Sequence, residues 1–227
     1  MNALDGFRRR LAMITAACLA ALTLGSGALA ADASAATLAP AKPCFVNRTK
    51  PARVTILGAG FHAGDNVEIG GHGFLADAVA GPSGTFLATG DAPVLGTTGP
   101  ASESFTLTTT DLTTPSITAT ATIKVANLAV LPTPLGVRNV HEDKVTFSFS
   151  GFTPGKRIYG YWLGKKSVAK TTFAKAKGVC GVLKQKALLY PGGHPTADKY
   201  TVAFEQTAHY SKRANPMFSG VLSIETL

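Results

Sequence analysis

The sequence predicts an exported, all-β protein built from two tandem β-sandwich domains. Three observations carry this prediction: a secretory signal at the N-terminus, strand-like alternation along the rest of the chain, and an internal repeat. No stretch after the signal sustains the i, i+3, i+4, i+7 apolar spacing of an amphipathic helix. Glycine and proline instead separate short runs in which apolar and hydroxyl-bearing residues alternate, which is typical of a sandwich or barrel.

The first 30 residues have the three parts of a cleavable signal peptide. Residues 8–10 are arginines, residues 11–24 are almost wholly apolar, and Ala28-Leu29-Ala30 fits the small-x-small pattern of a cleavage site. The apolar part is shorter than the ~20 residues that span a bilayer. We therefore predict cleavage after Ala30, or after Ala35 at a second small-x-small match, and a mature chain without a transmembrane segment. The arginines leave the choice between the general secretory and twin-arginine routes open.

An internal repeat divides the chain that follows the signal. Residues 54–64 (VTILGAGFHAG) align with residues 145–155 (VTFSFSGFTPG) at an offset of 91 positions. Further along, residues 105–107 align with residues 200–202 at an offset of 95 positions. Two copies of one strand-turn-strand unit predict two domains of the same architecture.

The repeat sets the expected domain boundaries at residues 37–128 and 129–227, and the proline-rich residues 131–134 are expected to form a short, stiff linker. In residues 145–150 Val and Phe alternate with Thr and Ser, so one face of this strand is apolar and the other hydroxylic. Each domain contains roughly seven such runs, the number expected of an immunoglobulin-like sandwich of ~100 residues.

Two turns carry a resemblance to a known family. Residues 58–65 (GAGFHAGD) and 150–156 (SGFTPGK) resemble turns of the bacterial immunoglobulin-like repeats found in secreted actinobacterial proteins. Tyr159-Gly160-Tyr161-Trp162 and residues 178–183 (GVCGVL) extend the similarity to two-domain exported proteins of those bacteria. The resemblance covers most of residues 40–227. It implies a fold and an extracytoplasmic location, transfers no catalytic residue, and leaves the function open.

Cys44 and Cys180 are the only cysteines outside the predicted signal peptide. An even number of cysteines in an exported protein predicts a disulfide, with two unpaired buried thiols as the alternative. Because the two residues lie in different copies of the repeat, the bond would join the two domains. Closing so long a loop would stabilise the fold by about 4–5 kcal/mol in the chain-entropy model.

Positive charge is concentrated in the second domain. Residues 37–128 hold 5 Lys and Arg against 6 Asp and Glu, whereas residues 129–227 hold 14 against 5. This imbalance predicts a surface for anionic polymers of the cell envelope, with a solvated face that discourages strand pairing as the alternative. No nucleic-acid motif accompanies the lysines, so specific nucleic-acid binding is not expected. The candidate residues are Lys156, Arg157, Lys165, Lys166, Lys170, Lys175, Lys177, Lys184 and Lys186.

We expect no catalytic residue, no cofactor and no metal site. Ser83, in Gly81-Pro82-Ser83-Gly84, lacks the spacing and the following helix of a nucleophile elbow, so a hairpin turn is expected. His62 and His72 lie in glycine-rich turns near Asp65 and Glu68, but they are ten positions apart and lack the short spacing of zinc ligands. Ordinary loop histidines are expected.

The sequence therefore predicts a non-enzymatic interaction or structural module, secreted or in the cell envelope, whose partners are anionic envelope polymers or another envelope protein. A carrier of a small apolar ligand is the alternative, because the Gly-Phe turns also resemble those of neocarzinostatin-like sandwiches. Trp162 is expected in the core, where such folds bury a tryptophan. An apolar pocket beside Trp162 would favour the carrier, and a flat lysine-lined face would favour the interaction module.

Overall fold

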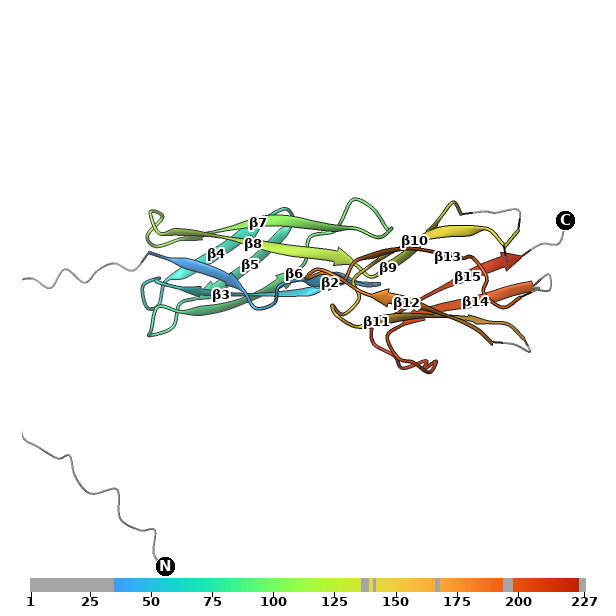
Figure 1. The fold of residues 1–227 in the computed structure, drawn as a ribbon. Helices are drawn as coiled ribbons and strands as arrows, with labels where there is room; N and C mark the ends of the chain where they lie inside the picture. Colours follow the sequence, from blue (N-terminus) through green and yellow to red (C-terminus); the bar gives the residue numbers. More distant parts are fainter. Residues whose placement is uncertain (1–34, 136–138, 141, 166–167, 194–197, 225–227) are drawn as a thin grey trace, which may run out of the picture. The chain divides into compact units, whose positions relative to one another are not determined.

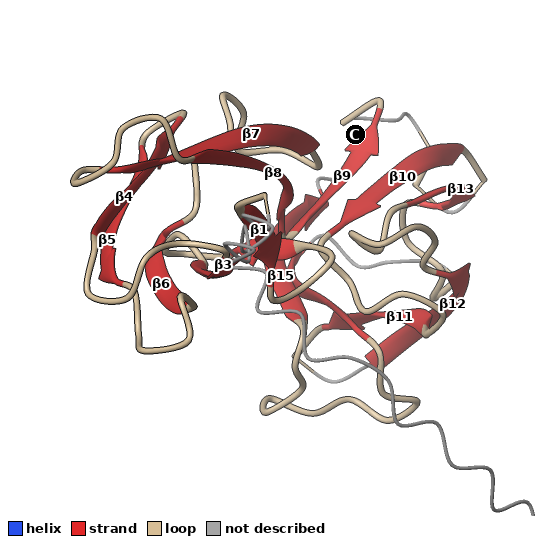
Figure 2. Ribbon diagram, turned by 90° about the vertical axis from the view of Figure 1, so that its left-hand side faces the viewer, coloured by secondary structure: helices blue, strands red, loops and turns tan. Residues whose placement is uncertain are grey.

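The computed structural model describes residues 35–135, 139–140, 142–165, 168–193 and 198–224, so the predicted signal peptide lies outside the described residues. Every regular element in these ranges is a β-strand, which confirms the predicted fold class (Figures 1 and 2). No helix in this part of the chain is long and apolar enough to cross a membrane.

The first eight strands form two sheets. A three-stranded sheet has the order β1-β3-β6, and a five-stranded sheet has the order β2-β8-β7-β4-β5. Alternate residues of both sheets, such as Val54 and Ile69, enter one shared apolar core. The strands are β1 (Thr37–Pro40), β2 (Phe45–Asn47), β3 (Arg53–Ala59), β4 (Asn66–Gly71), β5 (Phe74–Val79), β6 (Phe86–Asp91), β7 (Ser102–Asp111) and β8 (Thr118–Asn127).

The remaining seven strands form two further sheets around a second core. Their orders are β13-β10-β9 and β12-β11-β14-β15. Phe147 and Phe149 from one sheet meet Phe173 and Phe204 from the other, with ring centroids 4.9–5.8 Å apart across the core. The strands are β9 (Ala129–Thr133), β10 (Lys144–Ser150), β11 (Arg157–Leu163), β12 (Val168–Lys175), β13 (Leu183–Leu188), β14 (Asp198–Glu205) and β15 (Met217–Ile224).

Apart from β2, which has no counterpart among the later strands, the same strand order occurs twice. We call β1–β8 the first copy and β9–β15 the second copy of the repeat. β10 begins and ends 91 positions after β3, which confirms the offset seen in the sequence. β13 begins and ends 97 positions after β6, so the two copies correspond here as well. Contacts group Ser34–Leu227 as one unit, and the division into two domains at residue 128 stays a prediction.

The prediction that residues 131–134 form a linker is wrong for residues 131–133. Residues up to Thr133 belong to β9, which pairs with β10 in the register Thr146↔Thr133 to Ser150↔Ala129. Val130 is buried in the second core, and this burial holds the segment in the sheet. Pro132 is tolerated because β9 is an edge strand, in which the backbone N–H groups on the outer side need no partner strand.

A disulfide joins the two copies and confirms the predicted pairing. Cys44 and Cys180 have Cα atoms 5.4 Å apart although 136 positions separate them in the sequence. In addition, the hydroxyl of Ser150, the last residue of β10, donates to the carbonyl oxygen of Asn127, the last residue of β8, at 2.6 Å. One covalent bond and this hydrogen bond thus link the two copies.

Candidate functional site

The outer face of sheet β13-β10-β9 combines ammonium and hydroxyl groups. Lys184 lies directly opposite Ser148, and Lys186 lies directly opposite Thr146. Opposed residues of antiparallel strands project to the same face, and Lys144, two positions before Thr146, joins them. Because the intervening Phe147 enters the core, all five side chains lie on the face away from it. We call these residues the basic face.

A groove of about 540 Å³ adjoins the basic face. Both copies contribute to its lining, which includes Ser102, Leu131, Ser148, Lys177, Val182 and Lys184. Ammonium groups and hydroxyls are donors that suit the oxygens of phosphate, sulfate or carboxylate groups. The groove and the basic face together form a surface that can hold an anionic chain.

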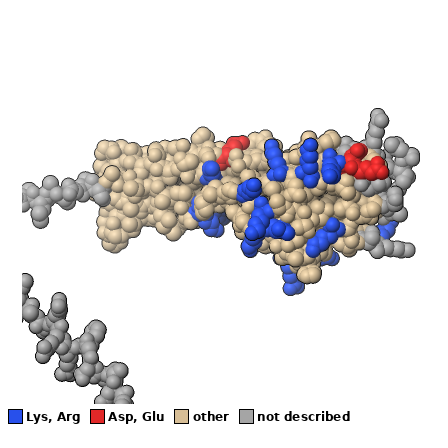
Figure 3. Space-filling model, viewed as in Figure 1, with Lys and Arg blue, Asp and Glu red and all other residues tan. Residues whose placement is uncertain are grey.

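The structure spreads the predicted basic residues that it describes over two sheets and the turns beside them. Lys184 and Lys186 lie on the basic face, and Lys177 lines its groove. Arg157 and Lys175 lie opposite each other on β11 and β12 of the other sheet, with Lys156 just before them. Lys165 follows β11, and Lys166 lies outside the described residues. Figure 3 shows basic side chains over several parts of the second copy, whereas the left-hand part of the first copy is uncharged on the side displayed.

The side chain of Lys170 makes contacts within the second copy. Its ammonium group donates to the carbonyl oxygen of Ala208 and lies 4.8 Å from the ring centroid of Tyr159 and 5.5 Å from that of Tyr161. Contacts of this kind with aromatic rings are worth about 0.5–1 kcal/mol at exposed sites. Lys170 therefore has a structural role that the sequence did not indicate.

A partly buried polar network includes Tyr161, one of the two rings that Lys170 contacts. The Tyr161 hydroxyl donates to the carbonyl oxygen of Thr207 at 2.9 Å, and Glu205 Oε1 accepts from the Thr207 hydroxyl and the Ser211 amide. Burial, followed by the charges of Glu205 and Tyr159, raises the pKa of Tyr161 to about 12. Tyr161 is thus a neutral donor near pH 7, which suits holding the loop after β14 rather than exchanging protons.

An apolar cavity of about 260 Å³ lies beside Trp162. Trp162 is 1% exposed, as expected for a core tryptophan. The cavity opens between the edge strands of the two sheets, and its lining includes Val130, Phe147, Trp162, Phe204, Phe218 and Leu222. Apolar walls without convergent polar groups suit a small apolar molecule.

The four residues considered as metal ligands in the sequence do not all meet. His72 lies against the ring of Phe105, with ring centroids 5.3 Å apart, and Glu68 is exposed on β4. His62 Nδ1, in contrast, lies 3.2 Å from Asp65 Oδ2. Ser83 is in a hairpin turn, as predicted, and its hydroxyl lies 2.8 Å from that of Thr85.

No protein-family model matches the chain, and no curated protein matches it. Among solved structures, it is similar to a tetra-tandem repeat in the extending region of a large adhesion protein, with 14% identity over 84% of this chain and 49% of that one (TM-score 0.29). The chain is also similar to a Ca²⁺-stabilised adhesin of an Antarctic bacterium, with 13% identity over 85% of this chain and 49% of that one (TM-score 0.27). A third similar structure is the C-terminal domain of the Streptococcus agalactiae AgI/II polypeptide BspA, with 8% identity over 84% of this chain and 98% of that one (TM-score 0.30). The chain spans about half the length of the first two proteins.

Proposed function

We propose that the protein is an exported, non-enzymatic interaction module that binds an anionic polymer on the basic face of its second copy. The observation that carries this proposal is the register of β10 and β13, in which lysines lie opposite hydroxyl residues. β9, β10 and β13 contain no Asp or Glu, so the strands themselves bring no opposing charge to this face. Repeated phosphate, sulfate or carboxylate groups of a polymer would meet ammonium groups along β13 and hydroxyls along β10.

Export and a two-domain organisation belong to the same proposal. The signal-like residues 1–30 support export, and a disulfide is typical of proteins that fold in an oxidising compartment. The separate apolar cores support immunoglobulin-like domains at residues 37–128 and 129–227. N-terminal sequencing of secreted protein should find Ala31 or Ala36 first, and either start leaves β1 intact.

Retention on immobilised anionic polymers tests the proposed binding. Purified protein should be retained on heparin and on teichoic-acid columns at low salt and released as the salt concentration rises, because binding releases counterions. An uncharged dextran column is the matched control and should not retain it. Passage through both anionic columns at low salt would contradict the proposal.

The cavity beside Trp162 favours a second candidate function, the carriage of a small apolar ligand. A cavity of ~150 Å³ holds benzene, so one of about 260 Å³ has room for a somewhat larger molecule. Trp162 is the only tryptophan of the chain, so tryptophan emission comes entirely from a residue that lines this cavity. Titration with naphthalene should change the emission saturably if the cavity binds ligands, and Gly220→Leu, which narrows the cavity, should abolish the change. An unchanged emission would exclude this function.

A further inference from the structure

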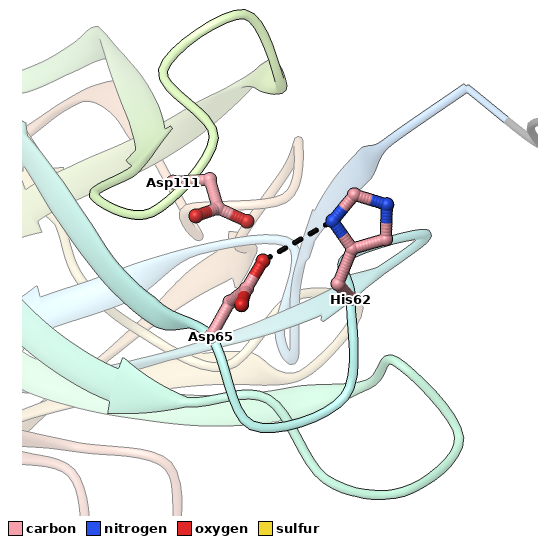
Figure 4. Close-up of side chains that lie close together, drawn as sticks. All are labelled: His62, Asp65 and Asp111. Atoms are coloured by element: carbon pink, nitrogen blue, oxygen red, sulfur yellow. Dashed lines mark hydrogen bonds and ion pairs between the residues drawn. The ribbon is translucent and has the colours of Figure 1, made fainter.

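Three side chains with metal-ligating atoms meet at one end of the first core (Figure 4). His62 and Asp65 lie in the turn between β3 and β4, and Asp111 is the last residue of β7. One ligand atom from each residue lies within 4.8 Å of the other two. The three residues come from segments more than 40 positions apart, so the fold, and not the sequence spacing, brings them together.

Asp111 is the unusual member of this cluster. Its side chain is fully buried, and Oδ1 accepts hydrogen bonds from the amides of Thr113 and Thr114 at 2.8 and 2.9 Å. Oδ2 is also buried but has no hydrogen-bond partner among the described residues. A buried polar atom without a partner destabilises the fold, and it does so more strongly when it is charged. A bound cation would give Asp111 Oδ2 the partner that it lacks.

The second copy shows that the fold does not require these groups. At the repeat offsets of 91 and 95, His62, Asp65 and Asp111 correspond to Thr153, Lys156 and Gln206. Gln206 Oε1 accepts from the Thr153 amide at 2.9 Å, and Nε2 donates to the Thr153 and Lys156 carbonyl oxygens. A neutral amide thus ties the turn to the end of β14 in the second copy. The first copy places three metal-ligating groups at the same positions.

We propose that His62, Asp65 and Asp111 bind a divalent transition-metal ion, with Zn²⁺ as the best match. One imidazole nitrogen with two carboxylate oxygens is a zinc-type ligand set, whereas Ca²⁺ takes six to eight oxygens. Ligands at Zn–N and Zn–O distances of about 2.0–2.2 Å lie about 3.5 Å apart in a tetrahedron, so the site must close by about 1 Å. The side chain of His62 is 67% exposed and can turn to do this. The bound ion would tie the β3–β4 turn to the end of β7.

Calorimetric titration of the purified, chelator-treated protein with ZnCl₂ tests this site. We expect about one Zn²⁺ per chain, a higher Tm on binding, and much weaker binding of CaCl₂. Asp111→Gln and His62→Thr, which install the residues of the second copy, should each weaken binding more than about tenfold. His72→Ala and His209→Ala are matched controls and should leave the affinity for Zn²⁺ unchanged.

His62→Thr changes an exposed turn residue, so it decides the question if Asp111→Gln fails to fold. The proposal is overturned if the parent protein binds no Zn²⁺, if both cluster variants bind it as well as the parent, or if the control variants lose it. Saturation by Ca²⁺ without Zn²⁺ binding would overturn the proposed class of metal.

Discussion

A Cβ atom on Gly181 would lie 1.5 Å from the carbonyl oxygen of Phe152. The hairpin before β13 thus rests directly on the Gly-Phe turn after β10, and the Phe152 amide donates to the Gly181 carbonyl oxygen. The first copy repeats this arrangement, because a Cβ atom on Gly84 would lie 2.2 Å from the carbonyl oxygen of Phe61. The contact closes one end of each apolar core beneath a buried phenylalanine.

Gly181→Ala should therefore destabilise the protein far more than Gly178→Ala. Both glycines have positive φ angles, of 60° and 63°, so both substitutions cost about 1–2 kcal/mol of backbone strain. A Cβ atom on Gly178 meets nothing within 4 Å, whereas one on Gly181 forces the turn apart. We expect a total loss above about 3 kcal/mol for Gly181→Ala in denaturant unfolding. Equal losses of stability in the two variants would contradict this prediction, because they would show that the hairpin can move away from the turn at no cost.

Much of this fold could be predicted from the sequence, because buried strands alternate apolar and polar residues. The offset between residues 54–64 and 145–155 predicted that β3 and β10 correspond. The correspondence between Gly84 and Gly181 was missed because the surrounding residues differ. Only the close approach of each glycine to a carbonyl oxygen shows why both copies need it.

Loss of the Cys44–Cys180 bond should destabilise the folded chain. The bond closes a loop of 136 positions, for which the chain-entropy model gives about 5 kcal/mol. Urea unfolding of the parent protein and of Cys44→Ser/Cys180→Ser, with thiol counts on the denatured oxidised samples, measures this effect. We expect a lower midpoint for the variant and a thiol count near zero for the parent. Two alkylated thiols in the parent, or unchanged midpoints, would contradict the prediction.

The raised pKa of Tyr161 should make the protein less stable at high pH. In the folded chain the pKa is about 12, against 10.0 for an ordinary tyrosine. Between these values the unfolded chain has lost a proton that the folded chain retains, so the free energy of unfolding falls as pH rises from about 10 to about 12. Below pH 10 this contribution is fully present.

Unfolding of the parent protein and of Tyr161→Phe at several pH values isolates this contribution from other tyrosines and from lysines. Tyr161→Phe also loses the hydrogen bond to Thr207, which should cost about 1 kcal/mol near neutral pH. The difference between the two proteins should shrink or reverse above pH 10. A difference that does not vary with pH would contradict the assignment.

The candidate surfaces were harder to predict than the fold, because neighbours in sequence can belong to different sheets. The lysines from Lys165 to Lys186 looked continuous in the sequence, but β12 and β13 belong to different sheets. Lys144 was missed because only the β10–β13 register brings it to the basic face. Asp111 was missed for a related reason, since no short spacing links it to His62 or Asp65.

Removing charge from the basic face should weaken polymer binding more than removing the same charge elsewhere. Lys144→Gln/Lys184→Gln/Lys186→Gln changes three lysines of the basic face, and Lys156→Gln/Lys170→Gln/Lys175→Gln changes three outside it. Both triple variants lose the same net charge. All six side chains are exposed, so five of the substitutions should each alter stability by less than about 0.5 kcal/mol. Lys170→Gln also loses the aromatic contacts of Lys170 and should cost about 0.5–1 kcal/mol.

Salt dependence of heparin binding distinguishes a defined surface from a general attraction. Each lysine that contacts the polymer should contribute about one unit to the slope of log K against log salt concentration. The basic-face variant should therefore lose about three units of slope, and the control variant less than about one. Equal losses would mean that net charge alone attracts the polymer. Unchanged binding of the basic-face variant would mean that these lysines form a solvated face that keeps the protein soluble.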